Sequence, residues 1–528
     1  MSEKITYTTT ASSEDFHREF EAAAAAVRAD FGRLVRNSIG GEPSAGGRAR
    51  EVRSPIDVRQ VVGRVEQASA EEAARAVERA HAAFPRWRDL GWERRVEILR
   101  RAAELIAERR LRLAAVMTWE VGKTRLEAMG EVEESADLLR YYCASMEEHR
   151  GFRRPLRRMH SAESTESVLL PYGVFGVIAP FNFPSALATG MMAGALVAGN
   201  TVVFKPSNEA PLCGFELCQA LWDAGVPRDV LHFVAGAGSE VGEAILHHRR
   251  TAGMAFTGSY DIGMRIFRNF SDEYPKPVVI EMGGKNPTIV TANADLEAAA
   301  EAVARSAFGF GGQKCSACSR VYVVDEVAER FTELLLERTR ALRVGSPLDR
   351  TTYVGPLIDA AKVDDYQDYL ERIREEGGEV LCGGEALRDA DLAHGHFVAP
   401  TVVRMADRDS ELFAEEMFLP ILLLAKVRDL DEALEFANRA PYGLTAGLFS
   451  RDRDEVERFF AGIESGVLYV NRRSGATTGA WPGINPFGGW KASGSTGPAA
   501  LGPYYLLKFL REQSRTVNGF EDAAPDAR

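Results

Sequence analysis

A candidate nucleophile stands in the stretch Gly309–Arg320. Cys315 follows a glycine-rich turn and Lys314, and small polar residues come after it. This surrounding predicts a flexible, partly exposed and electropositive loop, which favours the thiolate that a nucleophilic cysteine needs. An ordinary packed cysteine is the alternative, because free cysteines are usually buried. The partners that such a nucleophile would need must come from elsewhere in the chain.

Cys315 and Cys318 form a C-x-x-C pair, which could also be half of a metal site or a redox dithiol. There is no second such pair, and the close histidine pairs are His247-His248 and His394-x-His396. A redox dithiol would require a small thioredoxin-like fold, which the chain does not suggest. We therefore expect no metal, and we expect Cys318 to be a packing residue.

Composition narrows the class of protein. A chain of 528 residues is longer than one that folds around a single hydrophobic core, so several domains are expected. The net charge of −12 argues against nucleic acid or an anionic membrane as a partner. The N-terminus resembles no secretory signal, and no apolar stretch is long enough to span a membrane. The 6 cysteines do not form a disulfide framework and predict a cytoplasmic location.

Helical patterns dominate the first part of the chain. Residues 13–36 predict an amphipathic helix, interpreted as a packing arm without chemistry. Ser69-Ala70-Glu71-Glu72 is a capping-box start, and a helix with Val96, Leu99, Ala103 and Ile106 on one face follows. The run Glu131–Arg140 predicts a further acidic helix with solvated faces.

From residue 174 the pattern changes to short apolar runs between helices. These runs are Val174–Ala179, Thr201–Phe204, Met254–Phe256 and Val278–Ile280. The alternation predicts βαβ units with a buried parallel sheet, and ligands bind such sheets at the carboxyl ends of the strands. The residues that follow the runs are therefore site candidates: Pro180–Pro184, Lys205–Asn208, Thr257–Ser259 and Glu281–Pro287.

Taken in order, these motifs resemble the aldehyde dehydrogenase superfamily from about residue 50 to 515. Glu281–Lys285 resembles its glutamate signature and Phe310–Cys315 its cysteine signature. The resemblance implies an α/β aldehyde dehydrogenase fold with a Rossmann-like NAD-binding domain, an α/β catalytic domain and a small β oligomerisation element. The expected divisions are a helical arm at 1–50, the NAD-binding domain at 51–160 and 177–283, the catalytic domain at 284–485, the oligomerisation element at 161–176 and 500–516, and a disordered tail at 517–528.

The resemblance assigns catalytic roles to three residues. Cys315 would attack an aldehyde carbonyl to form a thiohemiacetal, and later a thioester. The Asn182 amide and the Cys315 backbone N–H would form the oxyanion hole. Glu281 would be the general base that activates water for hydrolysis of the thioester.

The resemblance also implies a nicotinamide cofactor, although the chain has no G-x-G-x-x-G motif. In the family, Lys205 contacts the adenosine ribose, Glu416 holds the nicotinamide ribose, and Gly258-Ser259 packs against the dinucleotide. We expect NAD; NADP is the alternative, because Asn208 replaces a glutamate that would repel a 2′-phosphate. The cofactor-binding residues expected are Lys205, Ser207, Asn208, Gly238, Gly242, Gly258, Ser259, Glu416 and Phe418.

Within the superfamily, Gln313–Arg320, Thr478–Ala480 and Gly502–Leu506 are most similar to 1-pyrroline-5-carboxylate dehydrogenases. Those enzymes oxidise glutamate γ-semialdehyde to glutamate. The resemblance implies that Ser316 and the backbone N–H groups of Gly479 and Ala480 anchor the substrate carboxylate, as an anion nest would. Phe183 and Phe487 would enclose the aliphatic chain, and Glu131 would face the ammonium group.

Two departures leave alternatives open. Met191 and Pro498 stand where general aldehyde dehydrogenases carry a proton path, which agrees with the subgroup. Trp481–Asn485 is bulkier than the subgroup pattern and could favour a different amino-acid or aromatic aldehyde. A coenzyme A-acylating enzyme and a catalytically silent binding protein are further alternatives, against which Glu281 and the intact Cys315, respectively, argue. A homodimer or higher homo-oligomer is expected.

Overall fold

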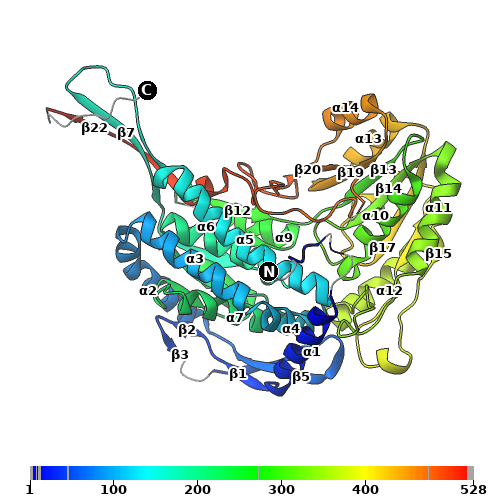
Figure 1. Ribbon diagram of the computed structural model, residues 1–528, viewed down its shortest axis with the longest axis horizontal. Helices are drawn as coiled ribbons and strands as arrows, with labels where there is room; N and C mark the ends of the chain where they lie inside the picture. Colours follow the sequence, from blue (N-terminus) through cyan, green and yellow to red (C-terminus); the bar gives the residue numbers. More distant parts are fainter. Residues whose placement is uncertain are drawn as a thin grey trace.

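The computed structural model describes residues 4–7, 9, 13–43, 47–271, 273–473 and 475–519. Figure 1 shows two lobes and a long β arm that projects from one of them. In the described ranges each lobe is built on a seven-stranded sheet. The mixed α/β architecture expected from the sequence is thus confirmed.

The first sheet has the strand order β12-β11-β8-β9-β10-β2-β3. Five adjacent strands run parallel to one another, and they are β8 (Val174–Ile178), β9 (Thr201–Lys205), β10 (Leu231–Phe233), β11 (Thr251–Thr257) and the edge strand β12 (Val278–Glu281). The four apolar runs of the sequence are all strands of this sheet. Their carboxyl ends therefore lie along one edge, as the βαβ pattern predicts.

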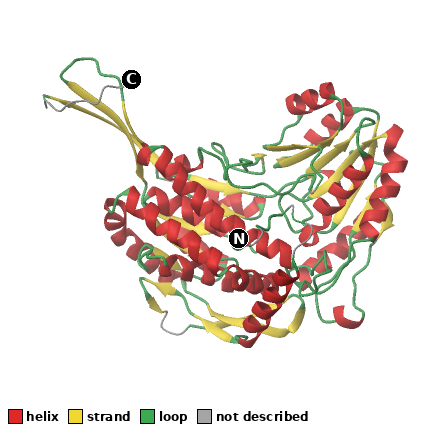
Figure 2. Cartoon of the chain, in the orientation of Figure 1, coloured by secondary structure: helices red, strands yellow, loops and turns green. Residues whose placement is uncertain are grey.

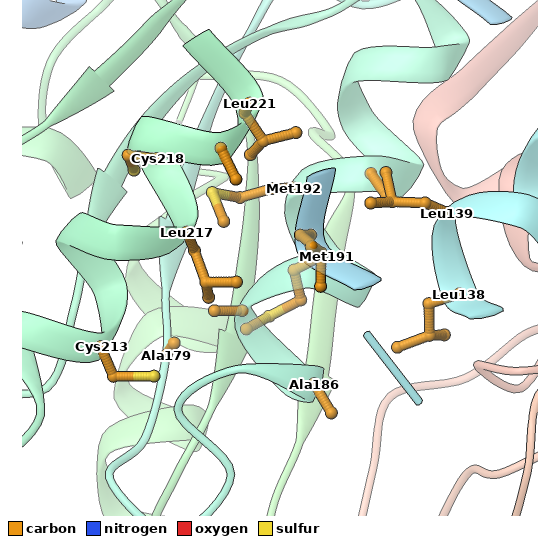
Figure 3. Close-up of a cluster of buried hydrophobic side chains, with 14 of the residues drawn as sticks. Leu138, Leu139, Ala179, Ala186, Met191, Met192, Cys213, Leu217, Cys218 and Leu221 are labelled. Carbon is orange, nitrogen blue, oxygen red and sulfur yellow. The ribbon is translucent and has the colours of Figure 1, made fainter. Parts of the chain in front are cut away.

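Helices cover both faces of the first sheet (Figure 2). The predicted capping box is present at Ser69, where α2 begins. The helices that cover the first sheet are α2 (Ala70–Asp89), α3 (Trp92–Glu108), α4 (Arg110–Val121), α5 (Arg125–Glu148), α6 (Ala186–Ala198), α7 (Pro211–Asp223), α8 (Glu243–Leu246) and α9 (Tyr260–Asn269). Figure 3 shows Leu138 from α5, Met191 from α6 and Leu217 from α7 in one apolar cluster. Met191 is therefore buried in the core, and its thioether has no proton to transfer.

The second sheet has the order β15-β16-β17-β14-β13-β19-β20. Only its edge strand β15 is antiparallel to its neighbour among the described strands. The strands are β13 (Asn286–Val290), β14 (Cys318–Val324), β15 (Glu379–Cys382), β16 (Thr401–Arg404), β17 (Ile421–Val427), β19 (Thr445–Phe449) and β20 (Val467–Val470). The covering helices are α10 (Leu296–Phe308), α11 (Asp325–Arg340), α12 (Ala360–Glu375), α13 (Leu430–Asn438) and α14 (Arg453–Gly462).

The start of the chain differs from the predicted helical arm. Helix α1 spans Glu14–Ala29, and the chain then forms β1 (Arg33–Val35), which pairs in parallel with β5 (Asp57–Glu66). Two short strands, β2 (Ser38–Ile39) and β3 (Glu42–Pro43), extend the first sheet, and β4 (Ala49–Ser54) pairs with β5. The helix expected over 13–36 therefore ends seven residues early, because residues from 33 onward satisfy their backbone groups in sheets.

The projecting arm is a three-stranded antiparallel sheet of β6 (Arg153–Pro155), β7 (Glu163–Pro171) and β22 (Leu510–Asn518). Strand β8 begins at Val174, so residues 174–176 belong to the first sheet and not to the predicted 161–176 element. Val517 and Asn518 are strand residues, whereas the rest of the predicted disordered tail, from residue 520, lies outside the described residues. Strand β18 (Tyr442–Gly443) pairs antiparallel with β21 (Trp490–Lys491) in a short two-stranded ribbon.

None of the helices in the described ranges is long and apolar enough to cross a membrane. All six cysteines lie in the described ranges and carry free thiols. Cys318 is buried in β14 against Thr288, with 3.2 Å between Sγ and Oγ1, as expected of a packing residue.

Candidate active site

The loop that carries Cys315 is rigidly held. After α10, Phe310, Gly311 and Gly312 all have left-handed backbone, with φ between 52° and 71°. A side chain at Gly312 would collide with the carbonyl of Leu419, so glycine is required there. The Asn286 amide donates to the carbonyls of Cys315 (2.7 Å) and Ala317 (2.9 Å), which ties the loop to β13. The predicted flexible loop is therefore wrong.

The electrostatic surroundings of Cys315 also differ from the prediction. Lys314 is paired with Glu127 and does not act as a free positive charge. Burial, together with the carboxylates of Glu416 and Glu281, raises the pKa of the Cys315 thiol to about 12. The thiol of the free protein is accordingly protonated at neutral pH, and its activation requires transfer of the proton to a base.

One cavity of about 270 Å³ lies between the two lobes in the described part of the chain. Cys315 and Glu281 line it together with residues from α5, α6 and α10. Seven of the residues expected from the sequence meet there: Phe183, Glu281, Cys315, Ser316, Gly479, Ala480 and Phe487.

Asn182 lies directly behind the cysteine loop. It is buried, and its Nδ2 donates to the carbonyl of Gln313 at 3.0 Å, two residues before Cys315. An amide nitrogen has two N–H groups, so one remains for a further acceptor. This contact brings Asn182 and the Cys315 loop together although 131 residues separate Asn182 from Gln313.

Glu281 is the last residue of β12 and lines the cavity. Its Oε2 accepts a hydrogen bond from the Gly489 N–H at 3.3 Å. Burial raises its pKa to about 8, and the ammonium of Lys508 and the Gly489 N–H oppose this rise. A carboxyl group with a pKa near neutrality is suited to general base catalysis.

Ser316 and the segment from Thr478 to Ala480 line the same cavity. The Thr477 hydroxyl donates to the Ser316 carbonyl at 2.7 Å and is bonded to the Ser306 hydroxyl at 2.8 Å. Gly479 has a left-handed φ of 91°, which turns the backbone here. These contacts hold the segment beside the Cys315 loop, and Ser316, Gly479 and Ala480 all line the cavity.

The position predicted for Glu131 is wrong. Its carboxylate is completely buried, paired with Lys123, and accepts from the backbone N–H groups of Ser185 (2.7 Å) and Ala186 (3.0 Å). Glu131 therefore caps the start of α6 and does not line the cavity. The cavity is lined instead by Glu134, nearly one helical turn further along α5. The i, i+3 spacing of the two acids was the signal that could have found Glu134.

The cofactor candidates gather at the carboxyl edge of the first sheet. Lys205 at the end of β9 is buried, its Nζ donates to the Pro206 carbonyl at 3.1 Å, and burial and nearby Arg50 lower its pKa to about 8. Ser207 and Asn208 follow, and the Asn208 carbonyl accepts from Arg50 at 2.7 Å. Arg50 also pairs with Glu209 at 2.7 Å, so an acidic residue does lie beside this position.

The remaining cofactor candidates surround the same edge. Gly258 and Ser259 join β11 to α9, and Gly238 and Gly242 bound a single helical turn after β10. Glu416 reaches across from the second lobe, where its Oε1 accepts from the Gly284 N–H at 2.9 Å. Phe418, next to it, has a left-handed φ of 57°, and its ring meets Phe181 edge-on at 6.1 Å.

These groups fit a dinucleotide. The Lys205 ammonium has donors left over after its bond to Pro206, and the second oxygen of Glu416 accepts nothing from the described residues. Both match the hydroxyl groups of a ribose. Gly238 has open space around it, where an added Cβ would meet no atom within 4 Å.

Residues 42–514 match the aldehyde dehydrogenase family, and the chain belongs to that family. It is 37% identical to a 1-pyrroline-5-carboxylate dehydrogenase from Geobacillus sp. (strain WCH70), over 95% of this chain and 96% of the relative. Among solved structures, it resembles 1-pyrroline-5-carboxylate dehydrogenase from Thermus with bound NAD, at 36% identity and a TM-score of 0.92, over 98% of this chain and 99% of that one. It also resembles proline utilization A from Bdellovibrio bacteriovorus, at 34% identity and a TM-score of 0.91, covering 97% of this chain and 53% of that longer protein.

Proposed function

We propose that the protein oxidises glutamate γ-semialdehyde, the open form of 1-pyrroline-5-carboxylate, to glutamate with NAD. One observation carries this proposal: a single cavity is lined both by Cys315 and Glu281 and by Ser316, Gly479 and Ala480. Cys315 and Glu281 are the groups for aldehyde oxidation, and the other three residues offer donors for a carboxylate. Glu134 adds an acidic group to the same cavity, which complements a substrate ammonium.

The reaction begins at Cys315. Its Sγ forms a bond to the aldehyde carbon while the thiol proton passes to Glu281, directly or through water. The carbonyl oxygen becomes an oxyanion, which accepts from the free N–H of Asn182 and from the backbone N–H of Cys315. Because the loop is fixed by Asn286, these donors are in place before the substrate arrives.

Lys205 and Glu416 would hold the two riboses of NAD, with Ser207, Asn208, Gly238, Gly242, Gly258, Ser259 and Phe418 around them. Bound NAD supplies the acceptor for the hydride that leaves the thiohemiacetal carbon. Glu416, from the second lobe, would orient this acceptor, so the cofactor site would depend on both lobes.

Glu281 then completes the reaction. Once the proton taken from Cys315 has passed to solvent, the Glu281 carboxylate takes a proton from water, whose oxygen attacks the thioester carbon. Cys315 leaves as a thiolate, which is reprotonated. The product is a carboxylate, and the aldehyde has lost two electrons as hydride. The raised pKa of Glu281, about 8, lets it carry the proton at neutral pH.

Two aromatic side chains, Phe183 and Phe487, line the cavity and would enclose the aliphatic chain. Trp481 is not one of the residues that line the cavity, and its indole N–H donates to Asp137 at 2.9 Å. This placement weakens the alternative of a bulky aromatic aldehyde that the sequence left open.

Turnover of 1-pyrroline-5-carboxylate with NAD tests the proposal, with propanal as the comparison substrate. We expect a much higher kcat/KM for the carboxylated substrate. Equal values would overturn the substrate assignment while leaving the enzyme class intact. Dependence of turnover on coenzyme A would support the acylating alternative, and unchanged turnover of a Cys315→Ala variant would exclude Cys315 as the nucleophile.

The antiparallel arm supports a homo-oligomer. Met159 and Val517, on the arm, are exposed, and strand β22 is exposed along nearly its whole length. Exposed apolar groups and unpaired strand edges are typical of surfaces that associate. Light scattering after gel filtration tests this, and a monomer at micromolar concentration would overturn it. The free cysteines agree with a reducing, cytoplasmic location.

A further inference from the structure

The start of the chain lies over the substrate cavity. Thr6, Tyr7 and Thr9 line it although the other lining residues come from the body of the two lobes. In Figure 1 the dark-blue beginning of the chain runs between the lobes beside α5. The sequence pattern assigned no role to these residues.

Tyr7 makes the most direct contacts with the cavity wall. Its hydroxyl donates to Oε2 of Glu134 in a short hydrogen bond. Its ring meets Phe183 edge-on at 5.9 Å and Trp481 at 5.9 Å. Tyr7 therefore contacts both the acidic group and one of the aromatic walls of the cavity.

The segment around Tyr7 is tied to α5 and to the loop after Ala480. Lys4 forms an ion pair with Asp137, and its ammonium lies 5.3 Å from the Trp481 ring centroid. Trp481 also donates to Asp137, and the Thr6 N–H donates to the Thr9 hydroxyl at 2.9 Å. The bulky Trp481, which departs from the family pattern, thus packs against the N-terminal segment.

We propose that Tyr7 is a specificity-determining residue that selects aldehydes bearing an α-ammonium group. This rests on the function proposed above. The tyrosine hydroxyl fixes the Glu134 carboxylate through Oε2, which leaves Oε1 to accept from the substrate ammonium. A hydrogen bond to a carboxylate is stronger than one between neutral groups, so it holds the orientation well.

The same bond favours the charged form of Glu134. Burial raises the pKa of this carboxyl group to about 8, and the hydrogen bond from Tyr7 opposes that rise. Burial and nearby carboxylates raise the pKa of Tyr7 well above its usual range, so its hydroxyl stays protonated and remains a donor. Tyr7 thereby keeps Glu134 available as an anion at a lower pH.

A Tyr7→Phe variant tests this proposal, because it removes the hydroxyl and keeps the ring. Two substrates are compared: 1-pyrroline-5-carboxylate and glutarate semialdehyde, which has the same chain and carboxylate without the amino group. We expect kcat/KM for the first to fall about ten-fold, the effect of one hydrogen bond to a charged group, and that for the second to stay within two-fold. Tyr366→Phe is the matched control, since the buried Tyr366 hydroxyl bonds to Thr401 in the other lobe. The kcat/KM values of this variant for both substrates should equal those of the wild type.

A second readout separates selectivity from packing. In Tyr7→Phe, the ascending limb of kcat/KM against pH for the amino substrate should move to higher pH. In a Glu134→Gln variant, adding the Tyr7→Phe change should cause no further loss of kcat/KM. An equal loss for both substrates, or no loss for either, would overturn the proposal. Wild-type protein that does not prefer the amino substrate would overturn the proposed function as well. A preference of unchanged size in Tyr7→Phe would overturn the role of Tyr7 alone.

Discussion

The Lys123 ammonium lies 3.6 Å from the centroid of the Phe183 ring, and Lys123 and its partner Glu131 are completely buried. Glu131 in turn accepts from the first N–H groups of α6, in the segment that follows Phe183. An ion pair behind the cavity wall therefore fixes the aromatic ring that faces the substrate. A desolvated cation–π contact contributes about 2 kcal/mol, so this position of the ring is well defined.

Replacement of Lys123 by methionine should destabilise the protein strongly. It leaves the Glu131 carboxylate buried without its counterion, which typically costs about 3–5 kcal/mol. Urea denaturation followed by circular dichroism measures the loss. The double variant Lys123→Met/Glu131→Gln should recover part of it, and a single variant as stable as the wild type would show that the pair contributes little.

The rate of thioester hydrolysis should rise with pH and level off above about 8. Glu281 acts as a base only when ionised, and burial raises its pKa from 4.5 to about 8. The pH dependence of deacylation in single-turnover experiments measures this. Lys508 lowers the pKa of Glu281, so a Lys508→Met variant should move the midpoint to higher pH. A rate that is flat between pH 6 and 9 would exclude Glu281 as the base.

Glu281 should also make the stability of the folded protein depend on pH, and stability should fall with rising pH while the hydrolysis rate increases. The folded protein holds the Glu281 proton more tightly than the unfolded chain, so this group reduces the free energy of unfolding as pH rises from about 4.5 to about 8. Glu281→Gln should accordingly be more stable than the wild type at pH 8 and similar to it near pH 4.5. Thermal unfolding at the two pH values measures the difference, and an equal shift at both would contradict it.

Ser316→Ala should weaken recognition of carboxylated aldehydes. The change removes one proposed donor to the substrate carboxylate and leaves the bond from Thr477 to the Ser316 carbonyl intact. We expect KM for 1-pyrroline-5-carboxylate to rise about ten-fold, with KM for propanal unchanged. An equal effect on both substrates would indicate a disturbed nucleophile loop instead.

Gly238→Ala tests where the dinucleotide lies. The added methyl group meets no protein atom within 4 Å, so the melting temperature should not change. If NAD packs against this turn, its Kd measured by fluorescence titration should rise at least several-fold. A variant with unchanged NAD affinity would remove Gly238 from the cofactor site.

Much of the framework follows from local patterns. The capping box at Ser69 and the four apolar runs that became β8, β9, β11 and β12 are short-range signals, and they appear in the structure. The predicted helix over 13–36 failed at its end, because pairing of β1 with β5 depends on residues about 30 positions away. Sequence periodicity does not report such pairing.

The site shows the same division. From the sequence alone came the residue types of the proposed nucleophile, base and oxyanion donor, because their motifs are local and occur in a fixed order. Only the tertiary structure decided that Lys314 is neutralised by Glu127, that Glu131 is buried while Glu134 lines the cavity, and that Tyr7 lines it too. The charge state and exposure of a side chain depend on the groups that surround it in space, and these come from segments distant in the chain.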